Sequence, residues 1–455
     1  MKKSYERPVI FKIQAGLFNK FGSAYLKRTR REIDGIPIEN LVSEYGSPLF
    51  VFSEKKLRGQ YKRLYKAFST RYPNVQFAWS YKTNYLDAIC AILHQEGEIA
   101  EVVSEFEYDK AKKLGIKGRD IIFNGPYKPI PALEKAIKDK AIINIDHFDE
   151  IHDIEEVAKR LNSTVKVGIR VNMDTGIKPQ WTRFGFNLDS GEALDAVKRI
   201  TFSNNLILNG LHSHIGTFIL NPDAYSIQVE KMVNFAYQVE DEFGFKIEYL
   251  DLGGGFPSKI RLKGIYLSPD VSVPELDEFV ELICEALLKS LRPNDFPKLI
   301  LETGRAIIDE AGYLISTVNA IKRLPDGRRA YVIDAGLNLL YTAFWYKYNI
   351  EVDAEVEGKL EPCVVYGPLC MNIDCIEEQA YLPPLPRGSR LIISPVGAYN
   401  VTQWLQFIHY RPSVVLITES GDTELIREKE DLEYVVSKEK LPDRLRIWIS
   451  QSNNK

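Results

Sequence analysis

Lys82 stands just after a short apolar run at residues 75–79, of the kind that forms a buried strand. An amphipathic helical pattern begins almost at once after it. A lysine at the mouth of a buried strand lies in a partly dry place, which disfavours its ammonium and lets its amine act as a nucleophile or form a Schiff base. The other interpretation is a surface lysine whose stem covers apolar groups while its charge stays in water.

Three consecutive glycines follow an apolar run at residues 249–252, and they are Gly253, Gly254 and Gly255. Such a run lets the backbone turn tightly and bring its N–H groups close to an anion such as a phosphate. It is also consistent with a plain turn. Arg305 lies in a neighbouring predicted loop, and its fork of donors suits a phosphate, which favours the first interpretation.

A carboxylate, Glu302, ends a further apolar run in the stretch Glu302-Thr-Gly-Arg305. At the end of a buried strand it could form an ion pair with a protonated heterocycle nitrogen of a ligand. It could equally pair with the nearby Arg305 and serve only the structure, which is the commoner role of such pairs. The sequence leaves both interpretations open.

Two histidines, His212 and His214, alternate at the end of an apolar run, so both are predicted to point to one face with Ser213 opposite. Two histidines on one face are typical of a metal site, but no third ligand of fitting type stands at a conventional spacing. We favour the interpretation that one histidine stacks on an aromatic ring while the other packs, and we predict no metal.

A single cysteine, Cys370, stands between turn residues and an aspartate in the stretch Gly367-Pro-Leu-Cys-Met-Asn-Ile-Asp374. If exposed in an active site, such a thiol can donate a proton or act as a nucleophile. By itself a cysteine is more often a small buried apolar residue.

The elements that must position these groups begin with eight apolar runs, each followed by an amphipathic segment. Eight strand-then-helix units predict a closed parallel (β/α)8 barrel, in which chemistry sits in the loops after the strands. Lys82, the glycine run and Glu302 all fall at that end. The predicted strands cover residues 75–80, 99–104, 121–124, 141–145, 165–171, 206–213, 249–252 and 299–302, with helices including 105–114, 148–161, 223–243 and 273–288.

Beyond about residue 306 the pattern changes to short strands without long helices, which predicts a C-terminal, mainly antiparallel β domain. We expect an N-terminal arm at 1–40, a barrel domain at 41–310 and the β domain at 311–455, with one strand added to it from about 45–53. The predicted strands of this domain are 312–322, 330–333, 350–356, 363–365, 390–393, 414–417 and 424–427.

Composition is that of a soluble globular protein, with 45% hydrophobic and 27% charged residues and a net charge of -3. This balance gives no reason to expect nucleic acid or a membrane as a partner. The five cysteines are an odd number without zinc-ligand spacing, and no secretory signal precedes them, so we expect a cytoplasmic location. Nine of the first 31 residues are Lys or Arg, which we interpret as a solvated extension.

The chain from about residue 33 to 436 resembles the fold type III, pyridoxal-phosphate-dependent decarboxylases, and within them it is most similar to the diaminopimelate decarboxylases, with ornithine decarboxylases more distant. Each motif is modest alone, but the motifs occur together and in order. They are Ile33-Asp-Gly-Ile36, Tyr45-Gly-Ser-Pro-Leu-Phe-Val51, Tyr81-Lys-Thr-Asn84, Gly210-Leu-His-Ser-His-Ile-Gly216, Asp251-Leu-Gly-Gly-Gly-Phe256, Glu302-Thr-Gly-Arg305, Gly367-Pro-Leu-Cys370 and Gly397-Ala-Tyr399.

The resemblance implies pyridoxal 5'-phosphate (PLP) as cofactor. Lys82 would hold it covalently through its amine, His214 would stack over the pyridine ring, and Glu302 would keep the ring nitrogen protonated. A protonated ring accepts the electron pair left when carbon dioxide departs, whereas a neutral ring accepts it poorly. Residues at the phosphate or its surroundings would be Gly253, Gly254, Gly255, Gly304, Arg305 and Tyr399.

The resemblance also implies an active site shared between two subunits. Cys370 matches the family's cysteine, which reaches the site from the partner subunit and returns a proton to the reacting carbon. The site would then be complete only in a homodimer, with Lys82, His214 and Cys370 as its catalytic residues.

Two departures from the family pattern concern the far end of the substrate. Diaminopimelate decarboxylases carry a glutamate after the cysteine, where this chain has Met371, and an Arg-Pro-x-x-Tyr run, where it has Thr342, Ala343 and Tyr346. An ammonium and a carboxylate buried without partners cost several kcal/mol each, which argues against diaminopimelate. The expected substrate-binding residues are Arg305, Tyr346, Met371 and Tyr399.

We therefore expect a homodimeric PLP-dependent decarboxylase with an alanine-racemase-like barrel, acting on the α-carboxylate of an amino acid. Its substrate would be less charged at the far end than diaminopimelate, such as an acylated or conjugated amino acid of a specialised biosynthetic pathway. Three alternatives stay open: a genuine diaminopimelate decarboxylase of lysine biosynthesis, a PLP-dependent racemase, which usually has a tyrosine at position 370, and a non-catalytic PLP-binding regulator.

Overall fold

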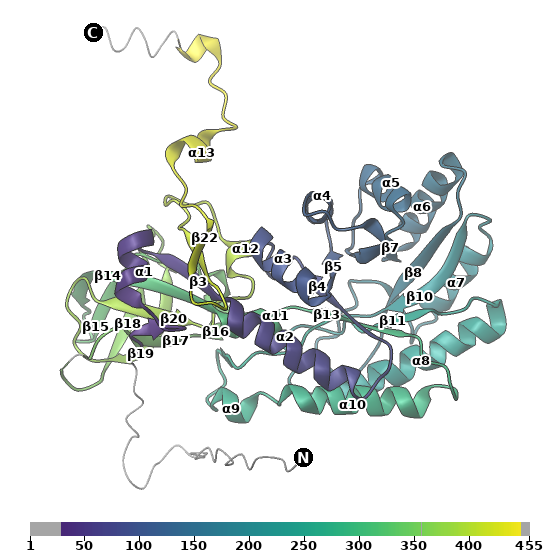
Figure 1. The fold of residues 1–455 in the computed structure, drawn as a ribbon, viewed down its shortest axis with the longest axis horizontal. Coiled ribbons are helices and arrows are strands. Elements are labelled where there is room, and N and C mark those ends of the chain that lie inside the picture. Colours follow the sequence, from purple (N-terminus) through teal and green to yellow (C-terminus); the bar gives the residue numbers. More distant parts are fainter. Residues whose placement is uncertain (1–28, 356, 447–455) are drawn as a thin grey trace.

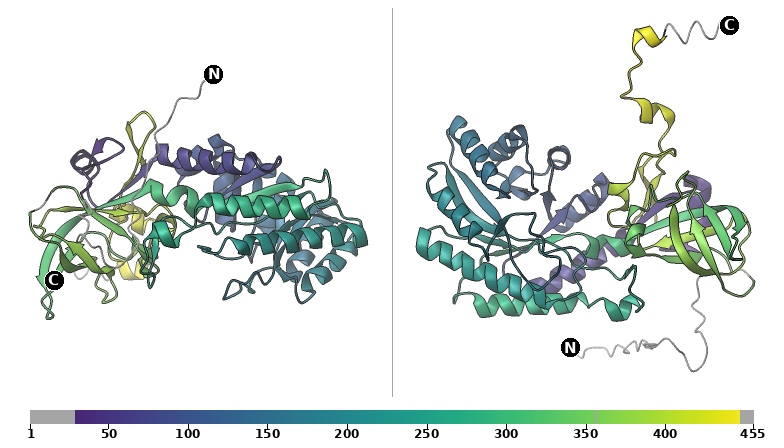
Figure 2. Two further views of the ribbon diagram at one scale, coloured as in Figure 1. Left: turned by 90° about the horizontal axis from the view of Figure 1, so that it is seen from below. Right: turned by 180° about the vertical axis from the view of Figure 1, so that it is seen from behind.

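The computed structural model describes residues 29–355 and 357–446, which form a barrel and a β-rich part beside it (Figure 1). The two parts lie side by side in the other views as well (Figure 2). The eight predicted barrel strands are all present, and they are β4 (Val75–Ser80), β5 (Ile99–Val102), β6 (Ile121–Phe123), β7 (Ile142–Ile145), β8 (Val165–Asn172), β10 (Leu206–His212), β11 (Tyr249–Asp251) and β13 (Lys298–Thr303).

These strands form a closed parallel barrel, as the sequence predicts. They pair in the order β10-β11-β13-β4-β5-β6-β7-β8, and β8 pairs with β10 to close the ring. The short strand β9 (Phe186–Asn187) adds to β8 outside the ring.

Helices cover the outside of the barrel. The predicted helix at 223–243 is present unchanged as α8, which packs against α10, and α10 packs against α2. Helix α10 begins at Leu276, later than predicted, because Glu275 and Glu278 form a capping box at its start. The helices are α2 (Glu54–Ser69), α3 (Asp87–Glu96), α4 (Glu105–Lys113), α5 (Ile130–Asp139), α6 (Phe148–Arg160), α7 (Glu192–Thr201), α8 (Asp223–Phe243), α9 (Pro269–Ser272) and α10 (Leu276–Ser290).

The barrel interior holds an apolar layer beneath a polar one. Four buried residues from separate strands form the apolar layer, and they are Ala78, Ile122, Tyr249 and Ile300. Side chains on a strand return to the same face every second residue, so the positions two residues further on also face the interior. These are the buried polar residues Ser80, Asn124, Asp251 and Glu302. The fold therefore collects polar groups at the carboxyl ends of the strands.

Two glycines leave room for the Tyr249 ring within the barrel. A Cβ at Gly210 would lie 2.0 Å from that ring, and a Cβ at Gly168 would lie 2.2 Å from its hydroxyl oxygen. The hydroxyl donates a hydrogen bond to Asn144 Oδ1 at 2.7 Å. The ring thus fills the space below the polar layer and joins it through Asn144.

The second sheet has nine strands, paired mainly antiparallel. The exceptions are the parallel pairs β15–β18 and β3–β21. Strand β3, which precedes the barrel in the chain, lies between β14 and β21. The strands are β3 (Leu49–Ser53), β14 (Gly312–Arg323), β15 (Arg329–Ile333), β17 (Asn349–Val352), β18 (Glu361–Tyr366), β19 (Cys375–Leu382), β20 (Arg390–Ser394), β21 (Val414–Ile417) and β22 (Thr423–Arg427).

Strand β19 is absent from the sequence prediction. Its pairing with β18 shifts register twice, so its buried residues do not alternate regularly with its exposed ones. The polar run Glu377-Glu-Gln379 also interrupts its apolar pattern. A pattern of period two is the signal for a half-buried strand, and these irregularities remove it.

The remaining elements lie at the two ends of the chain and between the two parts. Of the predicted arm, residues 29–40 contain β1, β2 and the start of α1, and residues 1–28 lie outside the described residues. Val356, the last residue of the predicted strand 350–356, also lies outside them. The predicted domain boundaries stay a prediction. No helix among the described residues is long and apolar enough to cross a membrane. The elements are β1 (Glu32–Ile33), β2 (Ile36–Pro37), α1 (Ile38–Tyr45), β12 (Arg261–Leu262), α11 (Arg305–Ile308), β16 (Tyr346–Lys347), α12 (Asn400–Gln403) and α13 (Leu432–Val436).

The fit of Tyr249 against Gly210 can be tested by adding one methyl group. We expect Gly210→Ala to lower the free energy of unfolding by about 1–3 kcal/mol, because overpacking forces the ring out of place. Gly59→Ala in α2 is the matched control, since a Cβ there meets nothing within 4 Å. Helix propensity predicts that this control gains up to about 1 kcal/mol. Denaturant unfolding measures both, and equal stability of the two variants would contradict the packing.

Candidate active site

A cavity of about 610 Å³ lies at the carboxyl ends of the barrel strands. Residues of the barrel form most of its wall, and residues beyond β14 complete it from the second part. The sequence-predicted residues that line it are Lys82, His214, Gly254, Gly255, Glu302, Gly304, Arg305, Tyr346 and Tyr399. The fold therefore brings together most of the predicted site residues.

Lys82 follows β4 and pairs with the carboxylate of Glu101, which lies on the neighbouring strand β5. Burial alone would lower the pKa of Lys82, but Glu101 and Glu302 outweigh it, so the pKa of Lys82 is raised. The expectation that a dry site disfavours the ammonium is thus wrong, because two buried carboxylates stabilise that charge. The second part also contacts this loop, since the Thr402 hydroxyl donates to the backbone oxygen of Lys82 at 2.9 Å.

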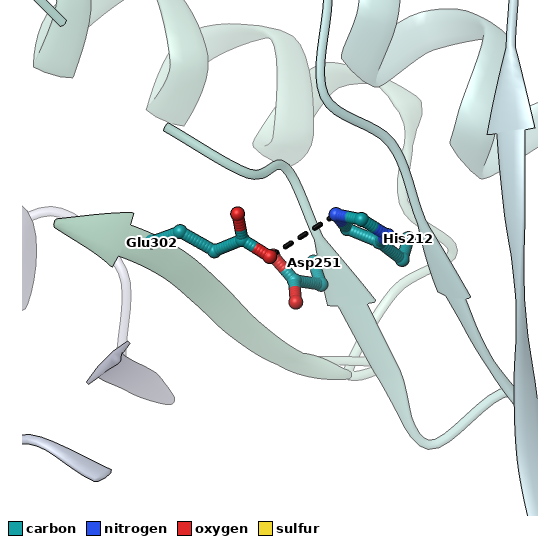
Figure 3. A group of neighbouring side chains, drawn as sticks. All are labelled: His212, Asp251 and Glu302. Carbon is teal, nitrogen blue, oxygen red and sulfur yellow. Dashed lines mark ion pairs between the residues drawn. The ribbon is translucent and has the colours of Figure 1, made fainter. Parts of the chain in front are cut away.

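Glu302 lies in the polar layer of the barrel, between two nitrogen-bearing side chains. Asn124 Nδ2 donates hydrogen bonds to Glu302 Oε1 and, at 3.0 Å, to Glu101 Oε1. His212 Nε2 lies 3.1 Å from Glu302 Oε1 (Figure 3). Burial opposes ionisation, but His212 and Lys82 favour it more strongly, so the pKa of Glu302 is lowered. Glu302 is therefore a carboxylate, and Oε2 is the oxygen that neither of these neighbours approaches.

His214 lies in the loop after β10 and borders the cavity. Its Nδ1 accepts a hydrogen bond from the Gly254 backbone N–H at 3.0 Å, and its ring centroid lies 5.4 Å from that of Trp181. Burial lowers the pKa of His214 to about 3, so its imidazole is neutral at physiological pH. A neutral ring that borders the cavity can stack on a flat ligand.

The glycine run passes so close to its surroundings that side chains have no space. A Cβ at Gly253 would lie 2.7 Å from His214 Nδ1, and one at Gly254 would lie 2.4 Å from the backbone oxygen of Glu302. Gly253 and Gly255 also have φ angles of 68° and 100°, which L side chains rarely adopt. The backbone can thus approach a bound group closely.

Arg305 pairs with Asp309 at 3.2 Å and not with Glu302, so the structural pairing considered for Glu302 is absent. Its guanidinium carbon lies 4.4 Å from the ring centroid of Tyr346 and 5.1 Å from that of Tyr399. Burial opposes the charge, but Asp309 outweighs it, so the pKa of Arg305 is raised. Two tyrosines thus hold a permanent cation at the cavity wall.

Cys370 and Met371 are exposed and are not among the residues that line the cavity of their own chain. Thr342, at the position of the family's arginine, is buried. Its hydroxyl lies 2.6 Å from the Tyr348 hydroxyl and 3.1 Å from Asn400 Oδ1, so its hydrogen-bonding capacity is used within the protein. The roles expected for these residues stay predictions.

Several cavity residues carry no expected role from the sequence. Glu101 is the most important, and the signal for it was a charged residue inside an apolar strand, which is rarely found without a partner. Trp181, Phe184 and Trp345 also line the cavity. They come from irregular segments, where no periodic pattern predicts which way a side chain points.

The sequence spacing suggested no third ligand for a metal, but the fold provides candidates. Ligand atoms of His212, Asp251 and Glu302 all lie within 4.8 Å of one another. The contact between His212 Nε2 and Glu302 needs a proton on that nitrogen, whereas metal binding needs the nitrogen's lone pair. We interpret the cluster as a contact between His212 and Glu302 and not as a metal site.

The barrel and its cavity together define a class of protein. A lysine amine at the end of one strand lies opposite a buried carboxylate, with a glycine loop, a neutral histidine and an arginine around the same cavity. This donor set fits PLP, which offers an aldehyde to an amine, a ring nitrogen to a carboxylate and a phosphate to an arginine beside a glycine loop.

Comparison with known proteins identifies the family within that class. Residues 58–309 match the family model described as "Pyridoxal-dependent decarboxylase, pyridoxal binding domain". The diaminopimelate decarboxylase of Methanocaldococcus jannaschii is 30% identical over 92% of this chain and 97% of its own length. That of Aquifex aeolicus is 29% identical over 89% of this chain and 94% of its own length.

A solved structure agrees with these relatives. The crystal structure of diaminopimelate decarboxylase from M. jannaschii in complex with L-lysine has a TM-score of 0.83 and 29% identity, and the match covers 91% of this chain and 96% of that one. The chain therefore belongs to the fold type III, pyridoxal-dependent decarboxylases and is a PLP-dependent carboxy-lyase like diaminopimelate decarboxylase.

Behind the cavity wall the side chain of Glu98 is buried with a hydrogen-bond partner for only one of its two oxygens. Glu98 accepts a hydrogen bond from the hydroxyl of Thr303, which lines the cavity, but its other oxygen is buried without a partner. Burial raises the pKa of Glu98 to about 8. The folded protein therefore holds a proton on Glu98 at neutral pH.

This proton makes stability depend on pH. Between the usual value of 4.5 and about 8, the folded state holds a proton that the unfolded chain releases, so stability falls as pH rises. We expect Glu98→Gln to remove this loss. Its melting temperature relative to the unchanged protein should rise from pH 5 to pH 8.5. Glu281→Gln, at an exposed position of α10, is the control. A pH-independent difference for Glu98→Gln would contradict the buried proton.

Proposed function

We propose that this enzyme removes the α-carboxylate of an amino acid whose far end lacks the paired ammonium and carboxylate of diaminopimelate. An acylated or conjugated amino acid of a specialised biosynthetic pathway fits this description. The observation that carries the proposal is that the described cavity wall holds no cation without an acidic neighbour, so none is left over for a distal carboxylate.

Each cation that lines the cavity already has an acidic neighbour. Lys82 pairs with Glu101, Arg170 lies 3.6 Å from Asp146, and Arg305 pairs with Asp309. A distal carboxylate would have to compete with a protein carboxylate for one of these cations. A buried charge that lacks a dedicated partner costs several kcal/mol.

The rest of the wall suits an apolar or aromatic group. Trp181, Phe184 and Trp345 all border the cavity, and Trp345 is half-exposed. Burying apolar surface of a substrate against such side chains is favourable without any ionic contact. These residues supply a candidate region for the far end of the substrate.

The residues around PLP have the following proposed roles. PLP, when bound, supplies a protonated ring that accepts the electron pair left by carbon dioxide. The Lys82 amine would hold the cofactor until the substrate amine takes its place. Glu302 would hold the proton of the ring nitrogen through Oε2, and His214 would stack on the ring. The glycine run and Arg305, with Gly304 and Tyr399 beside them, bind the phosphate or its surroundings.

A second candidate is diaminopimelate itself. It is favoured by the curated relatives, which are named diaminopimelate decarboxylases and match about 90% of this chain. Arg305 and Tyr346, two of the expected substrate-binding residues, are also present and in contact. The comparisons support this candidate at least as well as a non-standard substrate. Neither the racemase nor the non-catalytic regulator finds support among the relatives quoted above.

A substrate panel separates the two candidates. We expect the enzyme loaded with PLP to release carbon dioxide faster from diamino acids with a free α-amine and an acylated or conjugated distal nitrogen than from meso-diaminopimelate. Met371→Glu, which restores the family's acid at an exposed position, should raise the rate with diaminopimelate. Diaminopimelate as the fastest substrate would establish the second candidate instead.

Lys82→Ala should abolish the release of carbon dioxide and the visible absorbance of bound PLP, while Lys135→Ala on the surface of α5 changes neither.

We also propose that the active site is shared in a homodimer. Cys370 lies outside the cavity of its own chain, in an exposed segment with Met371 and Ile373. A partner that covers these apolar side chains can bring the thiol to the cavity mouth. The thiol then returns a proton to the reacting carbon, with Met371 beside the substrate.

Complementation tests this shared site. Lys82→Ala and Cys370→Ala homodimers should each be inactive. After they are mixed and allowed to exchange subunits, half of the dimers are mixed and each carries one intact site, so about a quarter of the full activity should return. The control is the Lys82→Ala protein alone, taken through the same subunit-exchange procedure. No recovery despite demonstrated exchange would place both groups in one chain.

A cytoplasmic location is part of the same proposal. Cys90, Cys284, Cys370 and Cys375 form no disulfide, and Cys90 and Cys284 are buried in the core. Reduced cysteines are typical of reducing compartments.

A further inference from the structure

Three neighbouring strands bring His212, Asp251 and Glu302 to one place inside the barrel. His212 and Asp251 are direct partners across the parallel pair β10–β11. Asp251 is in turn the partner of Ile300 on β13, and Glu302 lies two residues further along the same face. Figure 3 shows the three side chains converging from the ends of these strands. Their meeting is a consequence of register, and no sequence spacing reveals it.

The group is buried and incompletely hydrogen-bonded. His212 is 1% exposed, Asp251 0% and Glu302 4%. Both ring nitrogens of His212 and Asp251 Oδ2 have no hydrogen-bond partner among the described residues. His212 Nε2 nevertheless lies within ion-pair distance of Glu302 Oε1, at 3.1 Å. The imidazole is thus directed at Glu302, the carboxylate proposed to hold the proton of the cofactor's ring nitrogen.

The two carboxyl groups of this cluster have opposite environments. Glu302 has Asn124, His212 and Lys82 around it, whereas Asp251 accepts one backbone hydrogen bond, from Gly253. Burial and the nearby charge of Glu302 raise the pKa of Asp251, while the neighbours of Glu302 lower its pKa. Two adjacent acids whose environments move their pKa values in opposite directions take different protonation states.

We propose that His212 is a positioning residue that holds Glu302 ionised and turns its Oε2 toward the cofactor ring, while Asp251 stays a neutral acid. This inference rests on the proposed role of Glu302 at the ring nitrogen. His212 occupies Oε1 together with Asn124, so the remaining oxygen is left for the ring. Asp251, as a neutral acid, adds no second negative charge that would repel the carboxylate.

Replacing His212 separates this role from simple packing. His212→Leu should weaken PLP binding to the apoenzyme about tenfold, because the polar contact that stabilises the buried charge of Glu302 is lost. It should also shift the visible spectrum of bound PLP toward that of Glu302→Gln. His212→Gln keeps an N–H donor near the Nε2 position, and it should retain most of the affinity. The double variant of His212→Leu with Glu302→Gln should be no worse than Glu302→Gln alone.

Asp251→Asn is the control for protonation state. An amide closely matches a neutral acid in shape, so PLP affinity should change less than about twofold and the spectrum should not move. Circular dichroism and melting curves report folding, and His212→Gln serves where the leucine variant does not fold.

Three results would overturn the inference. Each applies to a protein that binds PLP. The first is an unaltered spectrum and PLP affinity in His212→Leu. The second is a loss of PLP affinity in His212→Gln as large as that in Glu302→Gln, and the third is an Asp251→Asn variant with the affinity and spectrum of Glu302→Gln. Failure of the unchanged protein to bind PLP would instead overturn the proposed function, and this inference with it.

Discussion

Charge buried at the carboxyl ends of the barrel strands is the constraint on which the rest of the site depends. A carboxylate inside a protein is costly unless cations and hydrogen-bond donors surround it. Here Glu302 and Glu101 share the amide of Asn124, and Lys82 lies against Glu101. Lys82 and Glu302 each favour the charged form of the other. Each group is stable only because the others are present.

The layered interior of the barrel explains how these groups come together. An apolar layer seals the barrel below, and the next interior positions on the same strands are polar. Tyr249 connects the layers, since it fills the space beside Gly168 and Gly210 and bonds to Asn144, whose amide donates to Asn124. The hydrogen-bonded chain therefore runs from the packed barrel through Asn124 and Glu101 to Lys82.

The second part of the molecule completes the cavity through one buried aspartate. Asp309 pairs with Arg305 through Oδ2 and accepts the backbone N–H of Ala398 through Oδ1 at 3.1 Å. The same segment carries Tyr399, whose N–H donates to the backbone oxygen of Thr83 beside the lysine. A cation of the barrel and a tyrosine of the β-rich part are thus held in one wall. Family membership accounts for this shared architecture, while Thr342 and Met371 are the positions at which substrate choice is open.

The sequence by itself determined the eight barrel strands, and most of the residues that it singled out line the cavity. Continuous apolar runs and ordered motifs consist of residues that are close together in the sequence. They can therefore be recognised without the structure. The sequence did not predict β19, whose register shifts break the alternation, or the role of Glu101, which only a neighbouring strand reveals. It left open whether Lys82 has a depressed pKa in a dry site or is an ordinary surface lysine, whereas the structure raises that pKa. The tertiary structure alone decided that pKa and the meeting of His212, Asp251 and Glu302. The physical reason is that electrostatic effects depend on distances across strands, and register and closure of the barrel set those distances.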